Sequence, residues 1–237
     1  MFFGIISFQP AVSHSQETRT LFAYSGYMRI PSANINSGQL TFDYTFLPNS
    51  VAIKSENVKS ENWIFSSSLG FFPFLECYFS VIISPQYNVS YGIPNYGSEK
   101  VRSWGAKLKI INESNSFPTV AIGLHDPNLK SFGASISIPN SSATFLVMTK
   151  QIIPQKISLS VGYGNDIFKG SYSRFNGIFG GVELKVNKNV SLLFDYDAEY
   201  WSEGISIQWR RINAVCGLVD LDNIAFRVGF DINLLNK

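Results

Sequence analysis

The sequence predicts an all-β protein: an antiparallel transmembrane β-barrel of about 12 strands, with short turns at one rim and longer loops at the other. Three observations support this fold class. Apolar and polar residues alternate along most segments, short and long connections alternate along the chain, and the composition supplies little charge for a water-exposed surface.

The composition is unusual for a soluble domain. Charged residues make up 15% of the 237 residues, against about 25% in typical soluble proteins, and aromatic residues also reach 15%. A hydrophobic content of 45% excludes a disordered chain. There is no apolar run of about 18 residues, so no transmembrane helix is predicted. A membrane would therefore be met by strands or by a surface helix.

Charge and cysteine content exclude two further classes of protein. The net charge is +2, from 19 Lys and Arg against 17 Asp and Glu, and the basic residues are scattered, so no nucleic-acid partner is predicted. The two cysteines, Cys77 and Cys216, fall on the apolar sides of distant strands. We therefore expect neither a disulfide framework nor a cysteine metal site.

The first residues are typical of the end of a secretory signal peptide. A short apolar stretch, Phe2 to Phe8, precedes small residues that offer cleavage patterns ending at Ser13 or Ser15. No basic residue comes before it, so two interpretations stay open beside a complete signal peptide: the true start lies upstream, or these residues form a buried N-terminal strand. The predicted organisation is a signal peptide over residues 1–15, a periplasmic N-terminal segment over 16–38 and an outer-membrane barrel over 39–237.

Alternation begins at Gln39 and persists to the end of the chain. In residues 39–46 every even position is large and apolar and every odd position is polar, which places the two sets on opposite faces of a strand. The predicted strands are 39–46, 61–69, 74–84, 101–111, 118–125, 142–150, 156–163, 176–186, 189–199, 203–210, 213–219 and 223–232.

The connections have a rhythm typical of outer-membrane barrels. Long polar connections over 47–60, 85–100, 126–141 and 164–175 alternate with short turns, and the pattern fades in the last third. Short turns of such barrels face the periplasm and long loops face outward. Both chain ends are then expected on the periplasmic side.

The polar face is expected to line the lumen. Twelve strands about 4.8 Å apart and tilted about 40° close at a backbone radius of roughly 12 Å, too wide for an apolar core and leaving a passage on the order of 10 Å at most. Charged side chains and the segment 16–38 would narrow it. The predicted lumen-lining residues are Glu76, Lys107, Lys109, Lys156, Glu183, Lys185, Asp195, Asp197, Glu199, Gln208, Arg210, Arg227 and Asp231.

The opposite face is expected to meet lipid, with tryptophan and tyrosine forming girdles at the interfaces. Trp201, next to Tyr200 at a strand end, is the clearest girdle candidate. The predicted lipid-facing or girdle residues are Tyr44, Trp63, Trp104, Tyr163, Tyr196, Trp201, Trp209, Phe226 and Phe230.

Nothing in the sequence indicates catalysis, a metal or a cofactor. His125 is the only candidate base besides His14 of the predicted signal, and no serine stands two places from it, as the outer-membrane lipase arrangement would require. The Asp220–Asn223 stretch could supply oxygen ligands to calcium, but it is more typical of an Asx-rich hairpin turn. The protein is therefore predicted not to be an enzyme.

Several local patterns occur in the order found in one family. The segments Gly26–Ala33, Phe72–Glu76, Lys107–Ile110, Phe117–Asp126 and Phe145–Lys150 resemble motifs of the YjbH/GfcD-like outer-membrane barrel proteins associated with exopolysaccharide production. Two positions depart from the family pattern: Gly105 stands where Asp is usual, and Thr144 where Glu is usual. Familiar members are also much longer, so the chain resembles a short, single-barrel relative.

The resemblance implies a non-enzymatic outer-membrane barrel linked to export, assembly or surface attachment of a polysaccharide. Outer-membrane lipid, polysaccharide and envelope export proteins are the partners it implies, and the lumen would act passively. Two alternatives remain open from the residues: a general structural or diffusion barrel without a dedicated glycan, and a secreted soluble all-β binding protein.

Overall fold

The computed structural model describes residues 17–48, 61–90, 93–125, 141–165, 167, 172–173 and 176–235. The predicted signal peptide, residues 1–15, lies outside these residues. In the described part of the chain, no helix is long and apolar enough to span a membrane.

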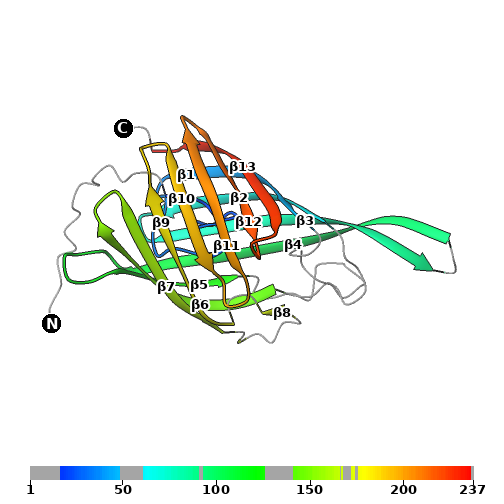
Figure 1. Cartoon of the computed structure of the whole chain (residues 1–237), viewed down its shortest axis with the longest axis horizontal. Coiled ribbons are helices and arrows are strands. Elements are labelled where there is room, and N and C mark those ends of the chain that lie inside the picture. The colour runs from blue at the N-terminus through cyan, green and yellow to red at the C-terminus, as the bar shows by residue number, and fades with distance from the viewer. Residues whose placement is uncertain are drawn as a thin grey trace.

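Twelve strands form a closed antiparallel barrel, as the sequence predicted (Figure 1). Each strand of the ring pairs with its neighbours along the chain, and β1 closes the ring by pairing with β13. A further short strand, β8, pairs in parallel with β6. The strands are β1 (Gln39–Leu47), β2 (Asn62–Phe72), β3 (Leu75–Ser90), β4 (Ile93–Ile111), β5 (Thr119–His125), β6 (Ser141–Ile153), β7 (Ile157–Asn165), β8 (Tyr172–Ser173), β9 (Gly177–Lys185), β10 (Val190–Tyr196), β11 (Trp201–Trp209), β12 (Ile212–Val219) and β13 (Asn223–Asn233).

The two rims of the barrel differ in their connections. One end of the barrel carries the β2–β3, β4–β5, β6–β7, β9–β10 and β11–β12 turns, together with the start of β1 and the end of β13. We call this end the turn rim. The opposite end, with the connections after β1, β3, β5, β7, β10 and β12, is the loop rim.

The β3–β4 hairpin is longer than predicted. The expected loop 85–100 instead continues as a two-stranded ribbon paired from Ser84↔Glu99 to Ser90↔Ile93, and it extends beyond the barrel to the right in Figure 1. The pairing of β3 with β2 ends at Ile83 and that of β4 with β5 ends at Gly105. No described strand therefore pairs with the outer edges of the ribbon, and proline is tolerated at such edges. Pro85 and Pro94 are the reason that the sequence predicted a loop here instead of two strands.

The alternation of the sequence becomes the two faces of the wall. Along β1 the odd positions Thr41, Asp43 and Thr45 are buried inside, whereas Phe42 on the outer face is 51% exposed. Most described outward side chains around the barrel are apolar. The exposed aromatic residues among them include Trp63, Phe65, Phe79, Trp104, Tyr163, Phe194, Trp201, Trp209 and Phe230.

Candidate functional site

The lumen is occupied by the N-terminal segment, residues 17–38, which we call the plug segment. Its described residues hydrogen-bond, ion-pair or make ring contacts with eleven of the twelve ring strands, β1 to β7, β9 to β11 and β13. So short a segment reaches strands on all sides of a barrel only from its interior. The passage expected from the strand number is therefore filled by the chain itself.

Many backbone hydrogen bonds of the plug segment are formed within the segment itself. Leu21 N donates to Met28 O at 2.8 Å, and Gly26 N donates to Thr18 O at 2.8 Å, so the chain doubles back on itself. Gly26 permits this fold because a Cβ there would lie 2.2 Å from the carbonyl oxygen of Ile30. The doubled-back segment places Leu21, Tyr24 and Met28 in contact with the wall, where all three side chains are fully buried.

Glu76 organises the strongest contact between plug and wall. Its Oε2 lies 3.0 Å from Lys107 Nζ, and its Oε1 lies 3.3 Å from Arg19 Nη1. Ser25 of the plug donates both its backbone N–H and its hydroxyl to the same carboxylate. Lys107 Nζ also donates to the carbonyl oxygens of Ser25 and Ser32, at 3.0 and 2.9 Å. Because all these groups are buried, each charge depends on its partners for solvation.

A second contact joins the plug to the end of β10. Arg29 Nη2 lies 2.8 Å from Asp197 Oδ2, and the guanidinium lies 5.1 Å above the Tyr200 ring. The backbone N–H of Arg29 donates to Asp195 Oδ2 at 2.7 Å. Asp197 in turn accepts hydrogen bonds from Glu199 N and Tyr200 N, which fixes the turn that presents it.

The wall carries a third charged group between these contacts. Arg227 pairs with Asp43 across the β1–β13 seam. Asp231 accepts from Thr41 at 2.8 Å and from Asn213 at 2.6 Å, and it lies 3.9 Å from Arg19 Nε. Among the described residues outside the plug, six buried carboxylates face two buried cations, Lys107 and Arg227, so Arg19 and Arg29 reduce an acidic excess.

The segments that resemble family motifs meet at this plug. Gly26–Ala33 forms its centre, Phe72–Glu76 supplies the central carboxylate, and Lys107–Ile110 supplies the lysine. In Phe145–Lys150, Thr149 accepts a 2.7 Å hydrogen bond from Ala33 N. Motifs distant in the sequence are thus parts of one plug-anchoring site.

The lumen wall changes character from rim to rim. Near the turn rim the inward residues are polar, as at Ser68, Glu76 and Thr149, whereas Leu47, Ile64, Ile82, Val219 and Ala225 are buried near the loop rim. The strict polar lumen expected from alternation therefore holds only for one half.

Aromatic rings fold over glycines on the inner wall. Three such pairs stand directly opposite each other on adjacent strands: Tyr78 and Gly105, Phe145 and Gly123, and Phe179 and Gly162. A Cβ at Gly105 would lie 2.2 Å from Tyr78 Cζ, so only glycine leaves room for the ring. This explains in packing terms why Gly105 departs from the Asp expected there.

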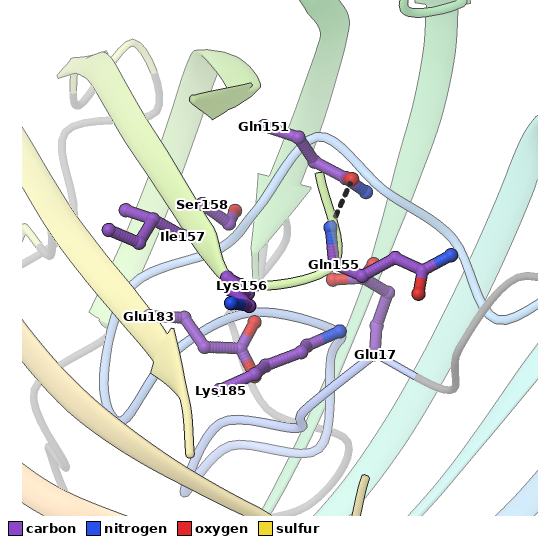
Figure 2. Close-up of a pocket in the computed structure, with 8 residues that line it drawn as sticks. All are labelled: Glu17, Gln151, Gln155, Lys156, Ile157, Ser158, Glu183 and Lys185. Carbon is purple, nitrogen blue, oxygen red and sulfur yellow. Dashed lines mark hydrogen bonds between the residues drawn. The ribbon is translucent and has the colours of Figure 1, made fainter. Parts of the chain in front are cut away.

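The plug enters the lumen beside a small polar pocket at the turn rim. Figure 2 shows Glu17 facing Glu183 and Lys185 of β9, with Gln151, Gln155, Lys156, Ile157 and Ser158 completing the lining. Burial, and then the nearby Glu183 carboxylate, raise the pKa of Glu17 to about 7. Thr18 donates to Glu183 at 2.9 Å, which ties the next plug residue to the same wall.

The predicted lumen residues fall into three groups. Buried inside the barrel are Glu76, Lys107, Glu183, Asp195, Asp197, Arg227 and Asp231. Half-buried toward the turn rim are Lys109, Lys185 and Gln208. Exposed in turns are Lys156, Glu199 and Arg210; Glu199 follows Ala198, whose φ of 76° ends the alternation of β10.

The predicted girdle residues all lie outside the lumen. Trp63, Trp104, Tyr163, Trp201, Trp209 and Phe230 are exposed, and Tyr44, Tyr196 and Phe226 are half-buried among neighbouring rings. Cys77 and Cys216 are free and exposed on the same outer face.

The sequence-based prediction missed Arg19, Arg29, Ser25 and Asp43. Asp43 lay on the polar side of the first predicted strand and was visible in the pattern. Arg19 and Arg29 are the only lysine or arginine residues before Lys54. The available signal was that these two cations could pair with the excess of acidic residues on the wall.

The remaining chemical candidates have structural partners. His125 Nδ1 lies 2.9 Å from the Tyr78 hydroxyl, and its ring stacks on Tyr78 at 5.6 Å. Asp220 to Asp222 form the turn between β12 and β13, and the described residues contain no group of three or more side chains suited to a metal ion.

Comparison with known proteins identifies a family. The family model described as "Exopolysaccharide biosynthesis protein YbjH" matches residues 18–214, from the plug segment to β12. No curated protein matches the chain. The resemblance noted in the sequence is confirmed.

Proposed function

Because the chain belongs to the YjbH family of exopolysaccharide biosynthesis proteins, we propose that it is an outer-membrane barrel serving the assembly, export or surface attachment of an exopolysaccharide. The observation that carries the membrane part is the inverted barrel. Charged side chains are buried inside, while aromatic and aliphatic side chains cover the outside. That distribution suits a barrel whose outer medium is lipid.

The occupied lumen favours a docking or assembly role over a diffusion pore. Arg19 and Arg29 bind opposite parts of the wall, and the plug between them fills the space through which a sugar chain would pass. In this state glycans and export proteins meet the rims and loops. No residue of the site performs covalent chemistry in this proposal.

Membrane fractionation tests the localisation. We expect the protein in the outer-membrane fraction, with a band that migrates faster in unboiled than in boiled samples, because a closed barrel resists unfolding in mild detergent. A soluble protein with no mobility shift would overturn the proposal and support the secreted binding domain. Reconstitution should give little conductance; a large, glycan-insensitive conductance would support the diffusion barrel instead.

Deletion of the gene in its host tests the link to polysaccharide. We expect less cell-attached exopolysaccharide in the deletion strain, restored by the wild-type protein. A variant with Glu76→Gln and Lys107→Met, confirmed to be in the membrane, tests whether the plug-anchoring site is needed; conservative Phe79→Leu on the outer face is the control. Unchanged polysaccharide in the deletion strain contradicts the proposal.

A further inference from the structure

The exposed charges of the described residues differ in sign between the two rims. At the turn rim Lys156, Lys188, Arg210 and Arg211 are exposed and Lys150 is half-buried, and Glu113 is their only acidic neighbour outside the lumen mouth among the described residues. At the loop rim the described exposed or half-buried acids are Glu61, Glu199, Glu203, Asp220 and Asp222, against one base, Arg102.

The basic residues of the turn rim directly border the apolar outer face. Exposed Trp209 ends β11 and is followed at once by Arg210 and Arg211; the Arg210 guanidinium lies 5.3 Å from the Trp209 ring centre. Lys188 follows exposed Val186 in the β9–β10 turn. Basic heads therefore stand at the edge of the apolar belt, where lysine and arginine reach the interface of a bilayer.

An aromatic cluster marks the same level on the opposite side of the barrel. Phe71, Phe72 and Phe74 are exposed at the β2–β3 turn, with ring centroids 4.5 Å apart for Phe71–Phe72 and 5.2 Å apart for Phe72–Phe74. Phe117 is 65% exposed in the next turn of that rim. Aromatic rings at this height are typical of the membrane–water boundary.

From this arrangement we propose that the turn rim binds the headgroups of anionic phospholipids, in the leaflet that surrounds that end of the barrel. The proposal rests on the membrane location proposed above and adds the lipid class and the orientation. The exposed basic residues of the turn rim complement phosphate-bearing, net negative headgroups. A soluble acidic polysaccharide is disfavoured because Lys188, Arg210 and Arg211 stand next to exposed apolar side chains such as Val186 and Trp209.

Refolding into vesicles tests this. The full chain is diluted from urea into vesicles of phosphatidylcholine alone or with added phosphatidylglycerol, and the heat-modifiable, co-floating fraction is measured. We expect phosphatidylglycerol to increase the ratio of co-floating to unbound chain at low salt, by up to about fivefold for each basic residue at the rim, and high salt to remove the increase.

Matched variants locate the effect. Lys156→Gln, Lys188→Gln, Arg210→Gln and Arg211→Gln together should abolish the phosphatidylglycerol dependence while leaving insertion into phosphatidylcholine unchanged. Glu199→Gln, Asp220→Asn and Asp222→Asn at the loop rim should leave that dependence intact.

Three results would overturn the proposal: equal insertion into both vesicles, dependence that survives the turn-rim variant, or polygalacturonate binding through these residues without any lipid preference. If no vesicle yields a heat-modifiable band, the membrane location itself fails and this inference fails with it.

Discussion

The inner and outer faces of β13 show two ways in which one strand is specified. Arg227 and Asp231 face inward, and each has particular partners, Asp43 for Arg227 and Asn213 on the neighbouring strand for Asp231. Phe226 and Phe230 face outward and contact similar rings, such as the stacked Phe46–Phe226 pair at 5.4 Å. The inner face depends on the geometry of specific pairs, whereas the outer face depends on a shared apolar character. We therefore expect inner substitutions to be costly and conservative outer ones to be tolerated.

The largest effect is expected at Glu76. Glu76→Ala removes the acceptor for Lys107, Arg19 and Ser25, and leaves two cations buried without it, which typically costs about 3–5 kcal/mol. Urea unfolding in detergent, followed by band mobility, measures this cost. Replacing Glu76 and Lys107 together by methionine should recover part of the loss. A Glu76→Ala protein as stable as wild type would mean that the contacts of Glu76 with Arg19 and Ser25 do not anchor the plug.

A smaller effect is expected from a charge on the outer face. Phe42→Lys places an ammonium at an exposed position midway along β1, and such substitutions on a lipid-facing strand cost about 2–4 kcal/mol. The yield of inserted barrel in vesicles measures it, with Phe42→Leu as the control that should behave like wild type. If Phe42→Lys inserts equally well, the outer face meets water and the membrane proposal is wrong.

Packing inside the wall should give a third, more modest effect. In Gly123→Ala the new Cβ would lie 2.2 Å from Cζ of the Phe145 ring, which itself is buried, so overpacking should cost about 1–3 kcal/mol. A double-mutant cycle with Phe145→Leu checks the cause, because the smaller side chain should relieve most of the strain. Additive effects in that cycle would exclude the ring as the obstacle.

The smallest effect is expected at Glu17, and it depends on pH. Its pKa is raised from 4.5 to about 7, so the folded state favours the protonated carboxyl. The stability linked to this group is present below about pH 4.5 and is lost as the pH rises through about 7. Glu17→Gln should therefore flatten the decline between these values and be more stable than wild type at pH 8. Identical pH profiles would show that Glu17 stays exposed to water.

Particular elements show how far the sequence could be interpreted. The strand at 39–46 was found within one residue because alternation between two media is a local signal. The ribbon over 84–99 was missed because Pro85 and Pro94 are unfavourable inside a sheet. They are acceptable there because no described strand pairs with the outer edges of the ribbon. The inward Ile64 and Leu47 were also unforeseen, since alternation separates two faces without saying what lies against each of them.

By itself, the sequence determined the all-β class, the twelve strands, the two faces of the clearly alternating strands and the family, because these depend on local periodicity and short motifs. Only the tertiary structure decided that residues 17–38 fill the lumen and that Arg19, Glu76 and Lys107 form one charged cluster. The physical reason is separation along the chain: Arg19 and Glu76 stand 57 residues apart, and Ser25 and Lys107 stand 82 apart. Periodicity assigns such residues to a face, but barrel closure selects their partners.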